Sequence, residues 1–112
     1  MILTTTVEIY SRTSSLDPNN EGIPKFTYTL ALSTGASVQP ATLTESELKS
    51  WGISSLVTDS KRVFIPGIYE LGQSWAMKDL GTSKTYQIRA VNPWPWIHTE
   101  MICEPYQGKS PI

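Results

Sequence analysis

The sequence lacks most of the residues on which catalytic and metal sites are built. It contains one cysteine, Cys103, and one histidine, His98, among 112 residues. A single cysteine cannot form a disulfide within the chain, and one cysteine with one histidine is too few for a structural zinc site. We therefore expect a fold held together by packing, with no metal and no other cofactor.

Long apolar runs and a net charge are also lacking. No apolar run approaches the roughly 18 residues of a membrane span, and the first ten residues do not have the pattern of a signal peptide. Nine basic and ten acidic residues leave a formal charge of −1, which gives no general attraction to a phosphate backbone or an anionic membrane. We expect a protein made in a cytoplasm, with no membrane partner.

The composition is that of one folded domain. The chain is 39% hydrophobic and 17% charged, and its length suits a single hydrophobic core. We predict one domain over residues 1–112 with three peripheral segments. These are a mobile loop from Arg12 to Pro24, a helix-containing insertion from Ala41 to Ser60, and a flexible tail from Pro105 to Ile112.

Alternation of apolar and polar residues predicts a mainly β fold. The clearest case is Lys25 to Leu32, where every second residue is a large apolar one. A turn at Ser33 to Gly35 would join it to the next strand as a hairpin, and the last two strands would form another. The other predicted strands are Thr4 to Tyr10, Gly35 to Pro40, Lys61 to Ile65, Ser74 to Leu80, Lys84 to Asn92 and Trp96 to Cys103. Six or seven short strands with one short helix predict a small β-barrel.

The predicted helix lies between Leu43 and Gly52. Thr44 and Glu47 form the pattern of a capping box, and Gly52 suits the left-handed position that ends a helix. Leu48 and Trp51 are three residues apart and share one face. This face either caps an open end of the barrel or lies in an interface with a partner.

Catalytic chemistry finds little support in the sequence. His98 and Glu100 lie two residues apart on one predicted strand, so a hydrogen bond between them is conceivable, but no nucleophile motif accompanies them. Cys103 ends an apolar strand and fits a small core residue better than a reactive thiol. No phosphate-binding glycine motif occurs. We therefore expect a binding protein and not an enzyme.

In the segment from Asn92 to Trp96, NPWPW, two tryptophans alternate with two prolines. Rings on a stiff extended loop are good anchors for a partner, because they bury much area at little entropic cost. The rings could equally fold back over a barrel end, and both interpretations stay open. The residues proposed for partner contact are Trp94, Trp96, Leu48, Trp51, Asn19 and Asn20.

An alternative function is an OB-like binding module for single-stranded nucleic acid or a peptide. Basic and aromatic residues of the second half could form one strand face for this purpose. Acidic residues interleave with them and weaken the pattern. The set comprises Lys61, Arg62, Lys78, Lys84 and Arg89 with Trp75 and Tyr86.

The order of segments from Val7 to Pro105 resembles the head-closure, or stopper, proteins and related minor capsid proteins of tailed bacteriophages. The matching segments are an N-terminal strand (VEIYSRT), a polar loop leading into an aromatic strand (EGIPKFTYTL), and Val38-Gln39-Pro40. They continue with a short acidic helix (LTESELKSWG), KRVFIPG, a strand with Lys84, Tyr86 and Ile88, and the histidine-containing IHTEMICEP.

This resemblance implies a small β-barrel protein of the virion, placed at the head–tail interface. Such a protein assembles as a homo-oligomeric ring below the portal and adaptor proteins, closes the channel that holds the packaged DNA, and offers a docking platform to a tail terminator or tail completion protein. In that setting, the segments Arg12 to Pro24 and Ala41 to Ser60 would contact the channel or a neighbour. Trp94 and Trp96 would anchor a neighbouring copy.

Overall fold

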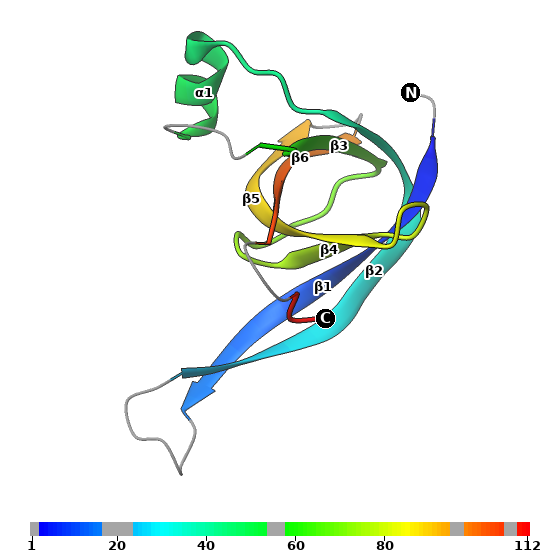
Figure 1. Cartoon of the computed structure of the whole chain (residues 1–112), viewed down its shortest axis with the longest axis vertical. Coiled ribbons are helices and arrows are strands. Elements are labelled where there is room, and N and C mark those ends of the chain that lie inside the picture. The colour runs from blue at the N-terminus through cyan, green and yellow to red at the C-terminus, as the bar shows by residue number, and fades with distance from the viewer. Residues whose placement is uncertain (1–2, 17–23, 54–57, 95–97, 107–109) are drawn as a thin grey trace.

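Six antiparallel strands close into a ring in the computed structural model (Figure 1), which describes residues 3–16, 24–53, 58–94, 98–106 and 110–112. The order around the closed barrel is β1-β2-β3-β6-β5-β4. The prediction of a mainly β barrel with one short helix is confirmed. The elements are β1 (Thr5–Leu16), β2 (Pro24–Pro40), α1 (Glu45–Trp51), β3 (Lys61–Pro66), β4 (Ala76–Asp79), β5 (Lys84–Trp94) and β6 (His98–Pro105).

The predicted hairpin turn from Ser33 to Gly35 is wrong, because these residues lie within the continuous strand β2. They pair with Glu8, Val7 and Thr6 of β1. Gly35 marks a close approach and not a turn, since a Cβ atom there would lie 2.9 Å from Cδ1 of Leu3. A glycine inside a strand often has this meaning.

The predicted loop from Arg12 to Pro24 is also wrong at both ends. Residues Arg12–Leu16 continue β1, and Pro24 opens β2. Serine and threonine in this stretch suit an extended strand once β2 lies alongside. Residues 17–23, with Asn19 and Asn20, lie outside the described residues. The predicted tail begins one residue too early, because Pro105 is still the last residue of β6.

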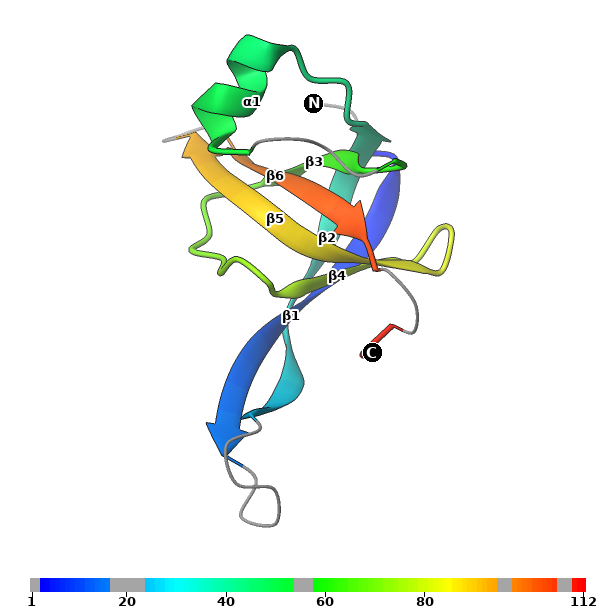
Figure 2. The same ribbon diagram turned by 60° about the vertical axis from the view of Figure 1, so that its left-hand side comes forward.

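The helix α1 has the predicted ends. Thr44 accepts a hydrogen bond from the backbone of Glu47, whose side chain accepts one from the backbone of Thr44, and Gly52 has a φ angle of 72°. The last two strands pair as predicted. Figure 2 shows α1 next to β5 and β6, at the opposite end of the molecule from the projecting ends of β1 and β2.

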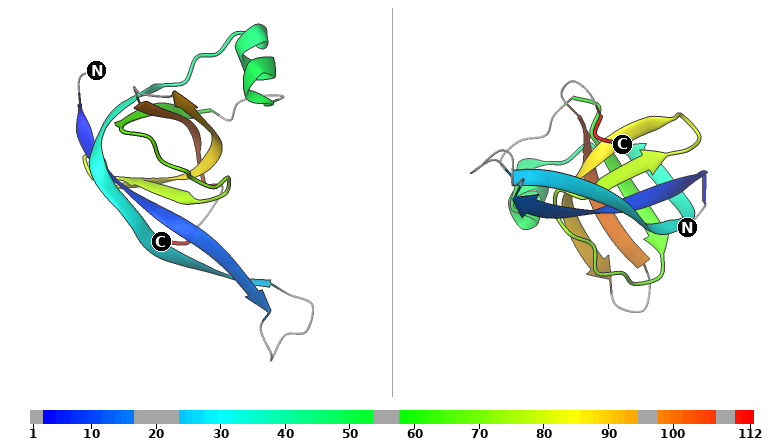
Figure 3. Two further views of the ribbon diagram at one scale, coloured as in Figure 1. Left: turned by 180° about the vertical axis from the view of Figure 1, so that it is seen from behind. Right: turned by 90° about the horizontal axis from the view of Figure 1, so that it is seen from below.

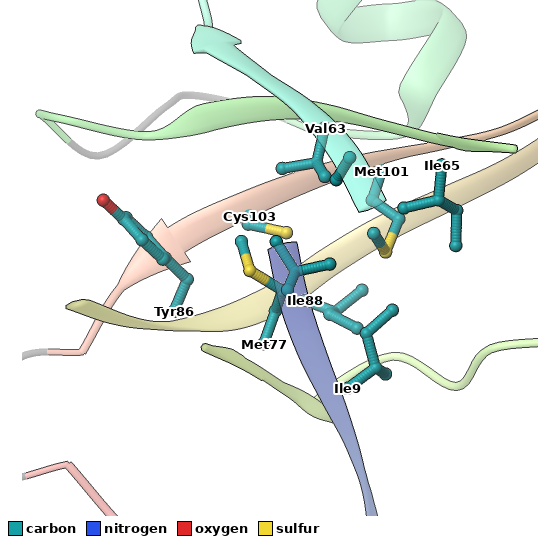
Figure 4. Packing of buried hydrophobic residues seen from close by; sticks show 10 residues of the cluster. Ile9, Val63, Ile65, Met77, Tyr86, Ile88, Met101 and Cys103 are labelled. Atoms are coloured by element: carbon teal, nitrogen blue, oxygen red, sulfur yellow. The ribbon is translucent and has the colours of Figure 1, made fainter. Parts of the chain in front are cut away.

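One hydrophobic core fills the ring, and strands from all parts of the chain contribute to it. Figure 4 shows these side chains converging, with the sulfur atoms of Met77, Met101 and Cys103 at the centre. Cys103 is fully buried, and burial raises the pKa of its thiol, so its predicted role as a core residue is confirmed. The buried members are Val7, Ile9, Ala36, Val63, Ile65, Met77, Tyr86, Ile88, Met101 and Cys103.

Replacing a central core residue should lower stability strongly. Ile88 is 1% exposed, and Ile88→Ala should reduce the free energy of unfolding by about 2–5 kcal/mol, because it removes buried apolar area and leaves a cavity. Urea denaturation measures this. The matched control is Leu80→Ala, whose side chain is 42% exposed and should change stability by no more than about 0.5 kcal/mol. Equal losses in both variants would contradict the assignment of the core.

Candidate interaction surfaces

The most distinctive surface is a two-stranded projection, here called the arm, made of Tyr10–Leu16 of β1 and Pro24–Leu30 of β2. Strand β4 pairs with β1 only from Val7 to Tyr10. Beyond that point the two strands of the arm pair only with each other among the described residues. Figure 3 (left) shows the arm extending away from the ring, and the molecule measures 47 Å along its longest axis.

A β-bulge at the base of the arm decides which side chains face outward. Ile9 lies opposite Leu32, whereas the next residue, Tyr10, lies opposite Leu30, so Ala31 is an extra residue in β2. Cross-strand partners share a face, and neighbouring residues in a strand have opposite faces. Leu32 therefore turns with Ile9 toward the core, while Leu30 turns with Tyr10 to the outside.

The outward face of the arm carries its large side chains. Phe26 is 45% exposed and Leu30 is 50% exposed. The guanidinium carbon of Arg12 lies 4.3 Å from the centroid of the Phe26 ring, a favourable cation–π arrangement. We call this face, formed by Tyr10, Arg12, Ser14, Phe26, Tyr28 and Leu30, the apolar face of the arm.

The opposite face of the arm carries short hydroxyl side chains. The Oγ of Ser11 donates to the carbonyl oxygen of Thr29 over 3.3 Å, and the Oγ1 of Thr13 donates to that of Thr27 over 3.4 Å. We call this the hydroxyl face. The arm is thus amphipathic, although it has no core of its own, and two-stranded ribbons are marginally stable in water.

Tyr106, the residue that follows β6, connects the barrel to the apolar face. Burial raises the pKa of its hydroxyl, the neighbouring Tyr28 adds to this, and Arg12 opposes it. The hydroxyl oxygen is buried, and no described group lies in hydrogen-bonding geometry to it. Tyr106 therefore packs where Tyr28 and Arg12 lie opposite each other, and it leaves Phe26 and Leu30 exposed on either side.

The helix α1 covers the outer wall of the barrel instead of an open end. Leu48 and Trp51 pack against a second cluster formed by Ile53, Ala90 and Ile102. Ile102 lies between two core residues of β6 and therefore points outward. Of the two predicted roles for this helix face, an end cap is wrong, and much of the face is used within the molecule.

A second β-bulge, in β5, turns Ala90 toward this outer cluster. Ile88 lies opposite Cys103, but Ala90 lies opposite Ile102, so Arg89 is the extra residue in β5. Ile88 consequently faces the core, whereas Ala90 faces α1.

An ion-pair network also joins α1 to this wall. The Nε of Arg62 donates to Oε2 of Glu100 over 2.6 Å, and its Nη1 lies 3.8 Å from Oε2 of Glu47. The Glu100 side chain is only 3% exposed, and the Arg62 guanidinium gives this buried carboxyl group a close charged donor. His98 packs its ring edge-to-face with Phe64 at 5.2 Å. The residues considered for acid–base chemistry thus have structural contacts.

The predicted OB-like face is not assembled. Tyr86 is buried in the barrel, Trp75 packs against its core, and Arg62 belongs to the network described above. Lys61 and Lys84 line two hollows at one barrel end, but Asp59 and Asp79 line them as well. These hollows therefore present mixed charge, and the Tyr86 ring that lines both of them is buried, which does not suit base stacking.

The predicted anchor residues are only partly described. Trp94 is the last residue of β5 and does not lie on a loop, while Trp96, like Asn19 and Asn20, falls outside the described residues. Residues that the sequence did not single out, Phe26 and Leu30, are the exposed apolar ones on the arm.

Within the described residues no group of three metal-ligating side chains occurs. No helix in that part of the chain has the length and apolarity to cross a membrane.

The fold has a counterpart among solved structures. The solution structure of protein SF1141 from Shigella flexneri 2a superimposes with a TM-score of 0.68 over 96% of each chain, at 18% sequence identity. The sequence matches no protein-family model and no curated protein. At this identity the likeness establishes the fold alone.

The Arg62–Glu100 pair should contribute strongly to stability. Arg62→Met should lower the free energy of unfolding by about 1.5–3 kcal/mol, because the buried carboxylate loses its charged donor. Arg62→Met combined with Glu100→Gln should recover part of this loss, since the buried charge is then gone. Urea denaturation measures both, with Arg89→Met as the control on an exposed cation. If the double variant is no more stable than the single one, the Glu100 charge is not the cause.

Tyr106 should make the protein sensitive to alkaline pH. Its folded-state pKa is raised above the ordinary value of 10.0, so the unfolded chain loses this proton first and stability falls as pH rises above about 10. Tyr106→Phe should reduce the loss of unfolding free energy between about pH 8 and about pH 11. Thr27→Ala, on the hydroxyl face, is the control. An unchanged loss in Tyr106→Phe would show that this hydroxyl ionises freely.

Proposed function

We propose that this protein is a structural component of the head–tail connector of a tailed bacteriophage. In this role, copies form a ring below the portal and adaptor proteins, close the DNA channel and offer a docking platform to the tail. The observation that carries the proposal is the arm, an amphipathic ribbon that leaves a closed barrel and exposes Phe26 and Leu30. The order of segments that resembles head-closure proteins supports it.

The barrel suits a rigid building block. Its six strands close on themselves, so each strand has a hydrogen-bonded neighbour on both sides over part of its length. The helix α1 is tied to the outer wall by Leu48, Trp51 and the Arg62 network. A rigid body of this kind holds its projections at defined angles, which a closed ring of copies requires.

The arm suits contact with a neighbour or with the channel. It extends beyond the barrel on the side away from α1 (Figures 1 and 2), and residues 17–23 join its two strands in the sequence. Since much of the predicted insertion's apolar face is used within the molecule, the arm takes over the role first assigned to both peripheral segments. The proposal therefore assigns contact with a neighbour or with the channel to the arm.

The described residues do not support the OB-like alternative. The aromatic rings on which it depended are buried or partly buried against the core. A stacking surface for single strands needs such rings at the surface beside a positively charged groove. The described residues offer neither in one place.

Binding to phage heads tests the proposal. The purified protein is mixed with heads that carry a portal and adaptor but lack this protein, and is sedimented with and without them. We expect it to sediment with heads of its own phage, because the portal and adaptor ring offers the surface on which copies assemble. A protein that stays in the supernatant with those heads would contradict the connector role.

A variant with a shortened arm sharpens this experiment. Residues 13–27 are replaced by Asn-Gly, which joins Arg12 to Tyr28, its opposite partner, through a two-residue turn. The barrel strands and Tyr106 keep their contacts. Head binding should fall by about ten-fold or more, since the exposed apolar side chain of Phe26 and its neighbours are removed. Leu80→Ala is the control and should bind like the unaltered protein.

A further inference from the structure

The two strands of the arm each have one unpaired edge. On one side of the arm, the edge of β1 that faces away from β2 has no neighbouring strand from Ser11 to Leu16, because the pairing with β4 ends at Tyr10. On the other side, β3 pairs with β2 only from Ser37 to Pro40. Within the described residues, no other strand covers either edge. Backbone donors and acceptors along both edges are therefore available for another strand.

These edges lack the features that usually protect an open strand. Proteins guard such edges with charged side chains, prolines or short length. Between Lys25 and Ala36 the only charged residue is Lys25 and no proline occurs, and between Ser11 and Leu16 the only charged residue is Arg12. The residues in between are mostly β-branched, aromatic or hydroxyl-bearing, which favour strand pairing. A long unprotected edge of this kind is a template for pairing with a strand of another chain.

We propose that the arms of neighbouring copies pair edge to edge, with β1 of one copy beside β2 of the next. The partner is a second copy because the arm supplies both halves of the contact. When two arms lie side by side in the same orientation, β2 of one runs antiparallel to β1 of the other, as the two strands do within one arm. The pairing then continues the existing ladder without a change of hand or direction.

Head-to-tail pairing also matches the faces of the arm. The apolar faces of the two arms lie next to each other in the extended sheet. Phe26 and Leu30 of one copy therefore lie beside the strand of the next copy that carries Tyr10 and Arg12. A two-fold pairing of β1 with β1 would leave both β2 edges open. Head-to-tail pairing satisfies every internal edge, and it closes when the copies form a ring.

This inference deepens the proposed function, and only the place of the ring in a virion rests on that function. The pairing itself is a property of the purified chain. If the protein binds heads but its arms do not pair, arm pairing is wrong and the proposed function stands. If the arms pair but the protein does not bind heads, the proposed function is wrong and arm pairing stands.

Disulfide trapping between engineered cysteines tests the pairing. The native Cys103 is fully buried, so it gives no background at the surface. Cα atoms on adjacent strands lie about 4.5–5.5 Å apart, which fits a disulfide. Cysteines are placed on the hydroxyl face, as Thr13→Cys or Ser15→Cys in β1 and as Thr27→Cys or Thr29→Cys in β2. Each variant carries one of them.

A β1 variant and a β2 variant of different mass are mixed at high concentration and oxidised mildly. We expect mixed dimers to form about ten-fold faster than with Ser50→Cys, an exposed control position on α1, because pairing raises the effective thiol concentration. The proposal is overturned if no β1–β2 combination exceeds the control. It is also overturned if β1–β1 or β2–β2 dimers dominate, since that result indicates two-fold pairing.

Sedimentation velocity gives an independent readout. The unaltered protein should show a larger average mass as its concentration rises, because edge pairing is a bimolecular contact. The variant in which Asn-Gly replaces residues 13–27 should remain a monomer over the same range. If both proteins show the same concentration dependence, association does not use the arm and the proposal fails.

Discussion

The bulge at Ala31 is the feature on which the two-part shape of the molecule depends. A strand presents its side chains to alternate faces, so one extra residue exchanges the faces for everything beyond it. Here the exchange falls where β1 and β2 leave the barrel. Leu32 stays with the core, while Leu30 and the aromatic residues before it turn outward. Without the bulge, Phe26, Tyr28 and Leu30 of β2 would lie on the other face of the ribbon, away from Tyr10 and Arg12 of β1.

The second bulge, at Arg89, works in the same way on the opposite side of the barrel. It turns Ala90 away from the core and toward α1, where it meets Ile102. The small alanine leaves room for Leu48 and Trp51 of the helix, and the Arg62 network closes one side of this contact. The two bulges together give the barrel one covered outer wall and one exposed arm. The proposed ring uses the second of these.

Two buried polar side chains among the described residues, Asp79 and Thr99, have structural roles. Asp79 accepts from the Oγ1 of Thr5 and from the backbone of Gly81, which ends β4 and shapes the turn to β5. Thr99 donates to the carbonyl oxygen of Gly67 and accepts from the backbone of Tyr69, which ties the loop after β3 to β6. Such satisfied contacts stabilise one arrangement of the strands and loops.

The sequence determined by itself whatever depends on residues a few positions apart. The capping residues Thr44 and Gly52 predicted the helix ends, and alternation placed most of the strands, because both signals are local. Only the tertiary structure decided the rest. The bulge at Ala31 depends on how β2 meets a strand about 20 residues away, and Gly35 could not be told from a turn residue until Leu3 lay over it. The exposure of Phe26 and Leu30, and with it the candidate site, follows from that long-range register, which no local pattern encodes.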